Sequence, residues 1–195
     1  ATKDRFLSII AHDLKNPFNT LLGYTELLNE KFRTYDVDKT EAIIGTLYST
    51  TQQTYKLLEN LLDWGRSQQN KIEFNPVKIE IGSVVDEVLE LLKSTADKKS
   101  ITLLQEIEVP CYVLADTYMI SAILRNLVCN AIKFTPLGGS VQVTIKNQNS
   151  MSRVSVSDNG VGISPDDIAK LFRIDVNLGH KGTSGEKGTG LGLIL

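Results

Sequence analysis

Long apolar runs are absent from this sequence, and that absence limits where the chain can reside. No stretch approaches the roughly 20 apolar residues needed to cross a bilayer, and no signal peptide is recognisable. The formal net charge is only −2, so the chain as a whole has little electrostatic attraction for nucleic acid or an acidic membrane. We therefore expect a cytoplasmic fragment with no membrane segment and no nucleic-acid partner.

Cysteine and histidine are also scarce, with two of each in 195 residues. Cys111 and Cys129 lack the spacing of metal ligands, so each is expected to be a small buried residue in a reducing compartment. The chain begins at Ala1 rather than Met, so we treat it as a piece of a longer protein. Whether that parent protein is anchored in a membrane is left open by the sequence.

The first third of the chain has helical periodicity from about residue 3 to residue 67. Two neighbouring stripes recur every seven positions: Leu7, Leu14, Leu21 and Leu28, and Ala11, Phe18, Thr25 and Phe32. The pattern lapses over residues 33–38, where Asp38 is a candidate cap for the next helix, and resumes as far as Gly65. Two long helices joined by a short connector predict an antiparallel hairpin.

A lone hairpin cannot cover two apolar faces, so this half of the chain needs a partner. Pairing two hairpins in a four-helix bundle supplies one, which predicts a homodimer. The alternative is that the apolar seam packs on the second domain of the same chain.

Residues 67–71 are polar and short, and they predict a boundary between a domain of residues 1–70 and one of residues 71–195. Beyond them, strands and helices alternate, with adjacent hairpin strands that favour a mixed or antiparallel sheet. The predicted strands are 72–79, 101–107, 112–114, 140–147 and 153–157, and the predicted helices are 81–96 and 117–134. The fold class is therefore α+β, a helical hairpin followed by a two-layer α/β sandwich.

His12 is the candidate nucleophile of the first helix. It lies about 100° around the helix from Ala11, beside the apolar stripe, and a neutral imidazole nitrogen can attack phosphorus near neutral pH. Asp13 is placed to accept a hydrogen bond from the other ring nitrogen, and Asn16, one turn further, can orient water. Pro17 should bend the helix locally. Taken alone, a solvent-exposed histidine without a role is the competing interpretation.

The predicted helix 117–134 carries a polar stripe of Asn126, Asn130 and Lys133 on an otherwise apolar sequence. Asparagine is a poor helix former, which favours a polar groove over an ordinary solvated face. The carbonyl oxygen of Asn130 suits Mg²⁺, and Lys133 can neutralise phosphate charge. A plain solvated helix face remains the alternative for this stripe.

Two glycine-rich segments complete the candidate site. Asp158 ends a predicted strand, where its carboxylate can accept a hydrogen bond from the adenine amino group, and Gly160 and Gly162 let the backbone approach a flat base. Taken alone, this segment is better interpreted as an ordinary turn. Gly188, Gly190 and Gly192 lead into an apolar run and predict a phosphate-binding loop that matches neither the P-loop nor the dinucleotide-binding pattern.

A polar, glycine-dotted stretch connects Phe172 to Gly188 and has little to pack. It is therefore expected to be a mobile lid, in which His180 is exposed and incidental.

Taken together, these segments resemble the histidine kinase family of two-component signalling. The residues from His12 to Pro17 resemble its H box, those from Asn126 to Phe134 its N box, those from Asp158 to Ile163 its first glycine box, and those from Gly188 to Leu193 its second. Leu171 and Phe172 resemble the F box. The resemblance covers essentially the whole chain, and the conjunction of motifs is far more specific than any single one.

The resemblance implies a dimerisation and phosphotransfer hairpin followed by a Bergerat-type ATP-binding sandwich. His12 would accept the γ-phosphoryl group with the help of Asp13, and Asn130 would coordinate Mg²⁺. The nucleotide contacts it implies are those of Asn126, Lys133, Phe134, Asp158, Gly160, Gly162, Gly188, Gly190, Leu191 and Gly192.

The same resemblance implies that the phosphoryl group passes to an aspartate of a response-regulator receiver domain. It also suggests phosphatase activity toward that regulator, with Asn16 positioning water. Family members continue beyond the second glycine box, so C-terminal elements are expected to be missing after Leu195. The alternatives are a gyrase-like ATPase and a dimeric interaction module without catalysis.

Overall fold

The computed structural model describes residues 2–68, 74–107, 110–148, 151–173, 180–186 and 192–193. The chain divides into two compact units, one built on residues 1–72 and the other on residues 73–172 and 178–193. The boundary after residue 70 stays a prediction. No helix in the described ranges is both long and apolar enough to cross a membrane.

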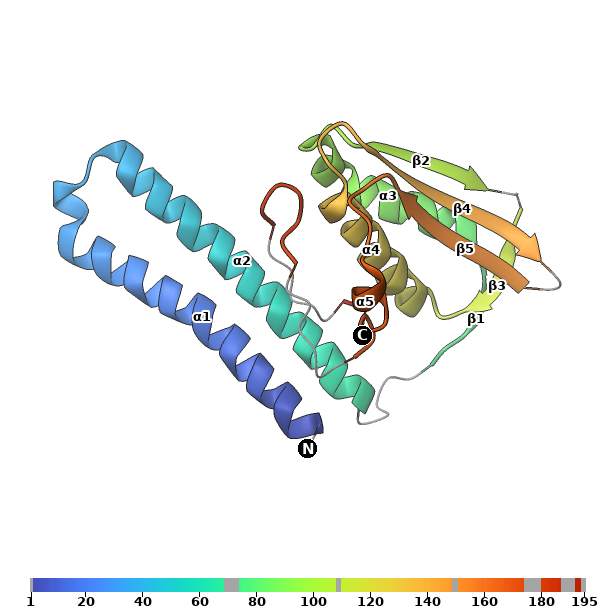
Figure 1. The fold of residues 1–195 in the computed structure, drawn as a ribbon, viewed down its shortest axis with the longest axis horizontal. Helices are drawn as coiled ribbons and strands as arrows, with labels where there is room; N and C mark the ends of the chain where they lie inside the picture. Colours follow the sequence, from blue (N-terminus) through green and yellow to red (C-terminus); the bar gives the residue numbers. More distant parts are fainter. Residues whose placement is uncertain are drawn as a thin grey trace. The chain divides into compact units, whose positions relative to one another are not determined.

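The first unit is a hairpin of two long helices, as predicted. Helix α1 (Thr2–Lys31) and helix α2 (Val37–Gln68) run antiparallel and pack side by side, joined through the 3₁₀ turn η1 (Phe32–Thr34) (Figure 1). Helix α1 continues through Pro17 without interruption. Ile43 and Leu57 are the buried apolar side chains that this unit contributes among the described residues.

Helix α2 is capped by Asp36, so the prediction of Asp38 as the cap is wrong. The Asp36 carboxylate accepts a hydrogen bond from the Lys39 N–H at 2.8 Å, and its carbonyl accepts one from the Thr40 N–H at 3.1 Å. Asp38 instead lies in the first turn of the helix, where its negative charge interacts favourably with the positive end of the helix dipole. The cap must precede the first helical residue, and the helix begins at Val37, two residues earlier than a cap at Asp38 would allow.

Much of the hairpin's apolar surface is exposed within a single chain. Large apolar side chains with about half or more of their surface in solvent occur along both helices: Phe18, Leu22, Phe32, Ile44, Tyr48, Tyr55, Leu58 and Leu62. Phe18 and Phe32, from one predicted stripe, are 52% and 54% exposed, whereas Leu14, Leu21 and Leu28, from the other, are half-buried. One hairpin therefore covers one apolar stripe and leaves the other uncovered.

Replacing Asp36 with Ala should lower the free energy of unfolding of the hairpin by about 1 kcal/mol, because the helix N-terminus loses its side-chain acceptor. Asp38→Ala, which removes the same charge two residues later, is the matched control and should cost less. Urea unfolding followed by circular dichroism gives both values. A larger loss for Asp38→Ala would contradict the assignment of the cap.

In the residues that the structure describes, the second unit contains two small sheets and three helices. Its strands are β1 (Val77–Glu80), β2 (Thr102–Ile107), β3 (Tyr112–Ala115), β4 (Ser140–Gln148) and β5 (Met151–Asp158), and its helices are α3 (Ile81–Asp97), α4 (Thr117–Phe134) and α5 (Pro165–Ile168). Strands β1 and β3 pair antiparallel, whereas β4 pairs parallel to β2 and antiparallel to β5. The prediction of a mixed sheet is therefore confirmed.

The first strand is shorter than predicted, because it begins at Val77 rather than at residue 72. Pro76 has no N–H for a strand ladder, and the Asn75 N–H instead donates to the Asp116 carboxylate at 3.1 Å. Asp116 also caps α4 through the Met119 N–H at 3.1 Å. These two hydrogen bonds hold the pKa of the Asp116 carboxyl below its usual value, and the bond from Met119 has the larger effect.

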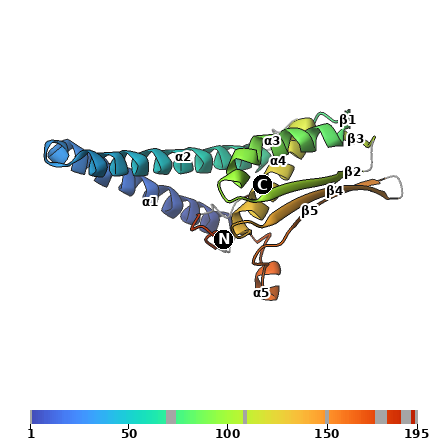
Figure 2. The ribbon, with the colours of Figure 1, turned by 90° about the horizontal axis from the view of Figure 1, so that it is seen from above.

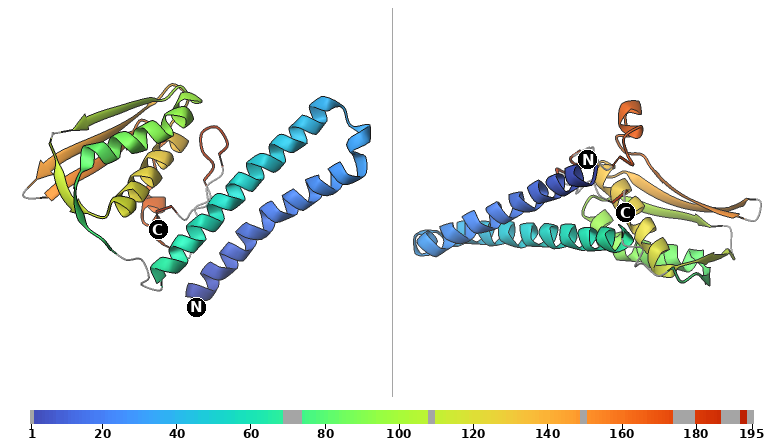
Figure 3. Two further views of the ribbon diagram at one scale, coloured as in Figure 1. Left: turned by 180° about the vertical axis from the view of Figure 1, so that it is seen from behind. Right: turned by 90° about the horizontal axis from the view of Figure 1, so that it is seen from below.

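Helices α3 and α4 cover one face of the β2–β4–β5 sheet, which gives the predicted two layers (Figures 2 and 3). Strand β4 is the central strand, and its alternate residues Val141, Val143 and Ile145 are fully buried beneath the helices. The helices contribute Val84, Val85, Val88, Leu92, Leu124, Val128, Ala131 and Ile132 to the same cluster. This core fixes α4 on the sheet.

Truncating Leu124 to Ala should lower the free energy of unfolding of this unit by about 3 kcal/mol, because the side chain is 2% exposed and leaves a cavity between helix and sheet. The neighbouring Ile123 is 51% exposed, so Ile123→Ala is the control and should cost under about 1 kcal/mol. Guanidinium unfolding measures both changes. Equal costs would show that α4 does not pack as described.

Candidate functional site

The candidate site is assembled on the C-terminal end of α4. The last four carbonyls of an α-helix have no partner within the helix and must be satisfied from elsewhere. The Ala131 carbonyl accepts a hydrogen bond from the Thr135 N–H at 3.0 Å, which closes the helix. The next three carbonyls, of Ile132, Lys133 and Phe134, accept hydrogen bonds from groups far away in the sequence. Those hydrogen bonds bring the predicted segments together.

The turn after β5 is bound to the last residue of α4. The Val161 N–H donates to the Phe134 carbonyl at 3.2 Å. A Cβ atom on Gly160 would lie 2.5 Å from the same carbonyl oxygen, so only glycine fits there without a shift of the backbone. Asp158 ends β5, as predicted, and its Oδ1 accepts a hydrogen bond from the Gly160 N–H at 2.9 Å. The exposed carboxylate is therefore oriented beside α4.

Residues 180–186 are bound to the same helix end. The Thr183 N–H donates to the Lys133 carbonyl at 3.0 Å, and the Thr183 hydroxyl donates to the Thr135 carbonyl at 2.7 Å. The sequence predicted that the stretch from Phe172 to Gly188 has little to pack against. That prediction is wrong for Gly182 to Glu186, because Thr183 is hydrogen-bonded to carbonyls at the end of α4. Residues 174–179 and 187–191 lie outside the described residues.

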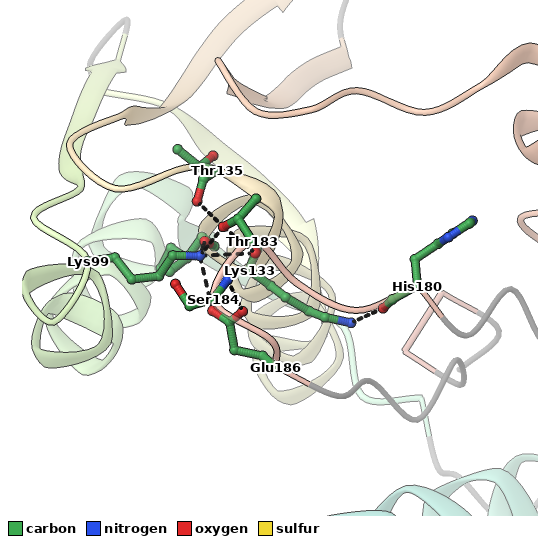
Figure 4. Close-up of polar contacts among 8 residues, drawn as sticks. Lys99, Lys133, Thr135, His180, Thr183, Ser184 and Glu186 are labelled. Atoms are coloured by element: carbon green, nitrogen blue, oxygen red, sulfur yellow. Dashed lines mark hydrogen bonds and ion pairs between the residues drawn. The ribbon is translucent and has the colours of Figure 1, made fainter.

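The Lys133 side chain reaches from α4 to this stretch. Its ammonium donates to the His180 carbonyl at 3.0 Å (Figure 4) and lies 4.5 Å from the centroid of the Phe134 ring. Burial lowers the pKa of the Lys133 ammonium, an effect opposed by the carboxylate of Glu186. His180 is exposed, as expected, and its ring lies 3.3 Å from the Asp167 carboxylate. Lys133 is therefore held by a neutral carbonyl that an anion can replace.

Asn126 and Asn130 are half-buried and lie one turn apart on α4. Gly192 packs against the first of them, since a Cβ on Gly192 would lie 3.1 Å from the Asn126 Oδ1. Gly162 has a φ of 70° and lies in the turn that follows β5. The predicted contacts Gly188, Gly190 and Leu191 fall outside the described residues.

Within the part of the chain that the structure describes, no group of three or more His, Cys, Asp or Glu side chains gathers as a metal site. A Mg²⁺ ion would therefore need ligands of another kind. The amide oxygen of Asn130 is a hard donor, and Mg²⁺ commonly combines one or two protein ligands with phosphate oxygens and water. The donor set at α4 fits that mode of binding.

The predicted phosphoacceptor residues lie on the other unit. His12 and Asp13 are within α1, but their side chains lie outside the described part of the structure, so the outward direction of His12 stays a prediction. Asn16 is exposed one turn further along, where its carbonyl accepts a hydrogen bond from the Thr20 hydroxyl at 3.2 Å.

Sequence reasoning missed Lys99 and Thr183, which donate hydrogen bonds to the end of α4, and Glu186, which pairs with Lys99. Lys99 looks like part of an exposed charged run with Lys98, yet it is 6% exposed, whereas Lys98 is exposed. No local pattern distinguishes the two lysines. The nearest signal is the change from helix α3 to strand β2 within a few residues, which turns one of them inward.

Both units match known protein families. Residues 2–70 match the family described as "His Kinase A (phospho-acceptor) domain", and residues 115–195 match "Histidine kinase-, DNA gyrase B-, and HSP90-like ATPase". Histidine protein kinase DivJ of Caulobacter vibrioides is 29% identical over 200 residues, which cover 100% of this chain and 33% of DivJ. The catalytic domain of histidine kinase ThkA is 30% identical, with a TM-score of 0.51 over 63% of this chain and 78% of that one.

Two further solved structures share the fold. Histidine kinase AdeS of Acinetobacter baumannii has a TM-score of 0.74 at 20% identity and covers 94% of this chain and 83% of its own. ThkA in complex with the response regulator protein TrrA has a TM-score of 0.71 at 22% identity, covering 85% of this chain and 48% of its own.

The hairpin and the sandwich thus define a two-unit protein, with a first unit of the phospho-acceptor domain type and a second unit of the ATPase type. The chain belongs to the histidine kinase family. It spans 24% to 37% of the length of the first three curated relatives that it matches.

Replacing Gly160 with Ala should weaken ATP binding by about tenfold, because the new Cβ pushes the turn that carries Asp158 away from Phe134. Gly138→Ala is the control, since Gly138 has a φ of 76° with nothing within 4 Å of the new atom. The control should cost about 1 kcal/mol of folding stability through backbone strain. Calorimetric titration with ATP and Mg²⁺ separates the two. Unchanged affinity of the Gly160 variant would contradict the role of this turn.

Proposed function

We propose that this chain binds ATP·Mg²⁺ in its second unit and transfers the γ-phosphoryl group to His12. The observation that carries the proposal is the gathering of Lys133, the Asp158 turn and Gly192 around one helix, α4, in a chain of the histidine kinase family. The family matches support ATP as the nucleotide, and the individual contacts below are our assignments.

In the nucleotide unit, the Asp158 carboxylate accepts a hydrogen bond from the adenine amino group, and Gly160 and Gly162 let the base approach the backbone. The Asn130 amide oxygen would hold Mg²⁺, and the bound ion would supply neutralisation of phosphate charge. Lys133 leaves the His180 carbonyl for a phosphate oxygen, a stronger acceptor because it is charged. Phe134, Asn126 and the second glycine segment, residues 188–192, complete the contacts.

At the acceptor, a neutral ring nitrogen of His12 attacks the γ-phosphorus while the bond to the β–γ bridging oxygen breaks, and ADP leaves with the electron pair. The Asp13 carboxylate accepts a hydrogen bond from the other ring nitrogen and stabilises the cation that forms. Positioning and charge neutralisation supply most of the rate in such a transfer.

The phosphoryl group then passes to an aspartate of a response-regulator receiver domain. The solved complex of ThkA with the response regulator TrrA supports a partner of this class. Asn16, exposed one turn from His12, positions water for hydrolysis of the regulator's acyl phosphate. With a partner and a nucleotide of these kinds, we propose that the fragment lies in the cytoplasm.

The exposed apolar side chains of the hairpin support a homodimer. Phe18, Ile44 and Leu58 are each about half exposed within one chain, and a second hairpin would cover them in a four-helix bundle.

His12→Gln should abolish acid-labile labelling by γ-labelled ATP and leave ATP binding unchanged, because only the acceptor nitrogen is lost. His180→Gln is the matched control. It removes the only other histidine of the sequence and should keep its label. Retained labelling of the His12 variant would refute the assignment.

The His12 variant and an Asn130→Ala variant should each be unlabelled alone, so label that appears after mixing shows that one chain acts on another. Size-exclusion chromatography with light scattering tests the dimer directly and should give twice the monomer mass. A monomer at micromolar concentration would refute the homodimer.

A further inference from the structure

A buried lysine lies under the candidate nucleotide site and contacts two segments of it, the end of α4 and residues 182–186. Lys99 is 6% exposed, and an ammonium group that leaves water must be hydrogen-bonded to remain charged without a large cost. Its Nζ lies within hydrogen-bonding distance of four acceptors (Figure 4). These are the carbonyls of Ile132 at 2.9 Å and Lys133 at 3.0 Å, the Thr183 hydroxyl at 2.6 Å and the Glu186 Oε1 at 3.0 Å.

The four acceptors belong to two segments that are about 50 positions apart in the sequence. Two are carbonyls at the end of α4 that have no partner within the helix. A positive charge there also interacts favourably with the negative end of the helix dipole. The other two, Thr183 and Glu186, belong to residues 182–186. An ammonium has three protons, so the four acceptors saturate it and none of its protons is left for a ligand. Lys99 thus joins the segments without being a nucleotide contact itself.

Glu186 is held as firmly as the lysine. Its Oε2 accepts a hydrogen bond from the Ser184 N–H at 2.8 Å, and its carbonyl accepts one from the Gly182 N–H at 2.8 Å. Burial raises the pKa of the Glu186 carboxyl, but hydrogen bonds from its own backbone, Lys99 and Ser184 outweigh it, and the pKa lies below its usual value. The carboxylate is therefore charged at neutral pH, so the pair with Lys99 is ionic.

Lys99, Thr183 and Glu186 are together called the clasp. The clasp fixes the backbone of Lys133, the residue proposed to meet the phosphates. The Lys133 carbonyl is one of its acceptors, so the clasp sets the backbone from which the Lys133 side chain extends. A Cβ on Gly182 would lie 2.7 Å from the Lys133 Cγ, so the held segment also packs directly on that side chain. In the sequence, Gly188 follows Glu186 by two positions.

We infer that Lys99 is a positioning residue for the triphosphate: by tying residues 182–186 to the end of α4, it holds Lys133 where it can meet the phosphates. The inference rests on the proposed ATP site and adds to it a residue that does not touch the nucleotide. It separates the site into a base-binding part around Asp158, which does not depend on the clasp, and a phosphate-binding part, which does.

Lys99→Met keeps the length and the apolar stem of the side chain and removes its charge. In the full protein, it should weaken binding of ATP·Mg²⁺ by about tenfold, the loss of one charge-assisted hydrogen-bonding arrangement. Adenosine, which has no phosphates, should bind within about twofold of the unchanged protein. Lys98→Met removes the same charge from the exposed neighbour and should alter neither affinity. Calorimetry for ATP and competition titration for adenosine measure both.

Glu186→Gln gives a second measure of the same clasp, because it keeps the shape of the side chain and removes its charge. Alone, it should weaken ATP·Mg²⁺ binding by about threefold, and in the Lys99→Met background it should have almost no further effect. The Thr183 amide, which donates to the Lys133 carbonyl, should exchange its hydrogen faster in Lys99→Met.

Equal weakening of ATP and adenosine by Lys99→Met would overturn the inference, since a general loss of folding affects both ligands. Independent effects of the Lys99 and Glu186 changes would overturn it as well. Should Lys99→Met unfold at the assay temperature, Glu186→Gln and Thr183→Val carry the same comparison of the two ligands. Failure of the unchanged protein to bind either ligand would instead refute the proposed function.

Discussion

The carbonyl groups at the end of α4 are the constraint on which the rest of the site depends. A helix that ends inside a domain must have its last carbonyls hydrogen-bonded, because an unpaired buried carbonyl is costly. Here Lys99, Thr183 and Val161 supply the hydrogen bonds, and each comes from a different part of the chain. The requirement of one helix terminus thereby brings together the turn after β5 and residues 182–186.

The rigidity of that helix end comes from the core beneath it. Leu124, Val128 and Ile132 are buried on α4 against the central strand β4, so the polar stripe on the other side of the helix has a fixed position. Lys133 extends from the last turn, where the packed core gives way to hydrogen-bonded loops. The proposed exchange, in which the Lys133 ammonium leaves the His180 carbonyl for a phosphate, therefore needs movement of the Lys133 side chain alone and leaves the helix and sheet unchanged.

The two units differ in how completely each buries its apolar residues. The sandwich has one continuous core, whereas the hairpin has few fully buried side chains among those described and exposes many large ones. Two helices can bury only the stripe between them, so a hairpin of this length carries a second apolar stripe that its own chain leaves uncovered. The first unit therefore leaves an apolar stripe that a partner would cover, whereas the second buries its apolar residues in a core of its own.

Local periodicity and turn chemistry determined most of the fold from the sequence alone. The bounds of α4 were predicted to the residue, and the hairpin, the mixed sheet and the position of Asp158 at a strand end followed from patterns within a few positions. The start of β1 and the cap of α2 were predicted wrongly, because Pro76 has no N–H for a strand ladder and Asp36 caps α2 through hydrogen bonds that periodicity does not contain. Only the tertiary structure decided that Lys99 is buried and that residues 182–186 are held, since those hydrogen bonds join residues 33 to 87 positions apart. Two adjacent lysines have the same side chain, and only the folded chain decides which of them meets the end of a helix.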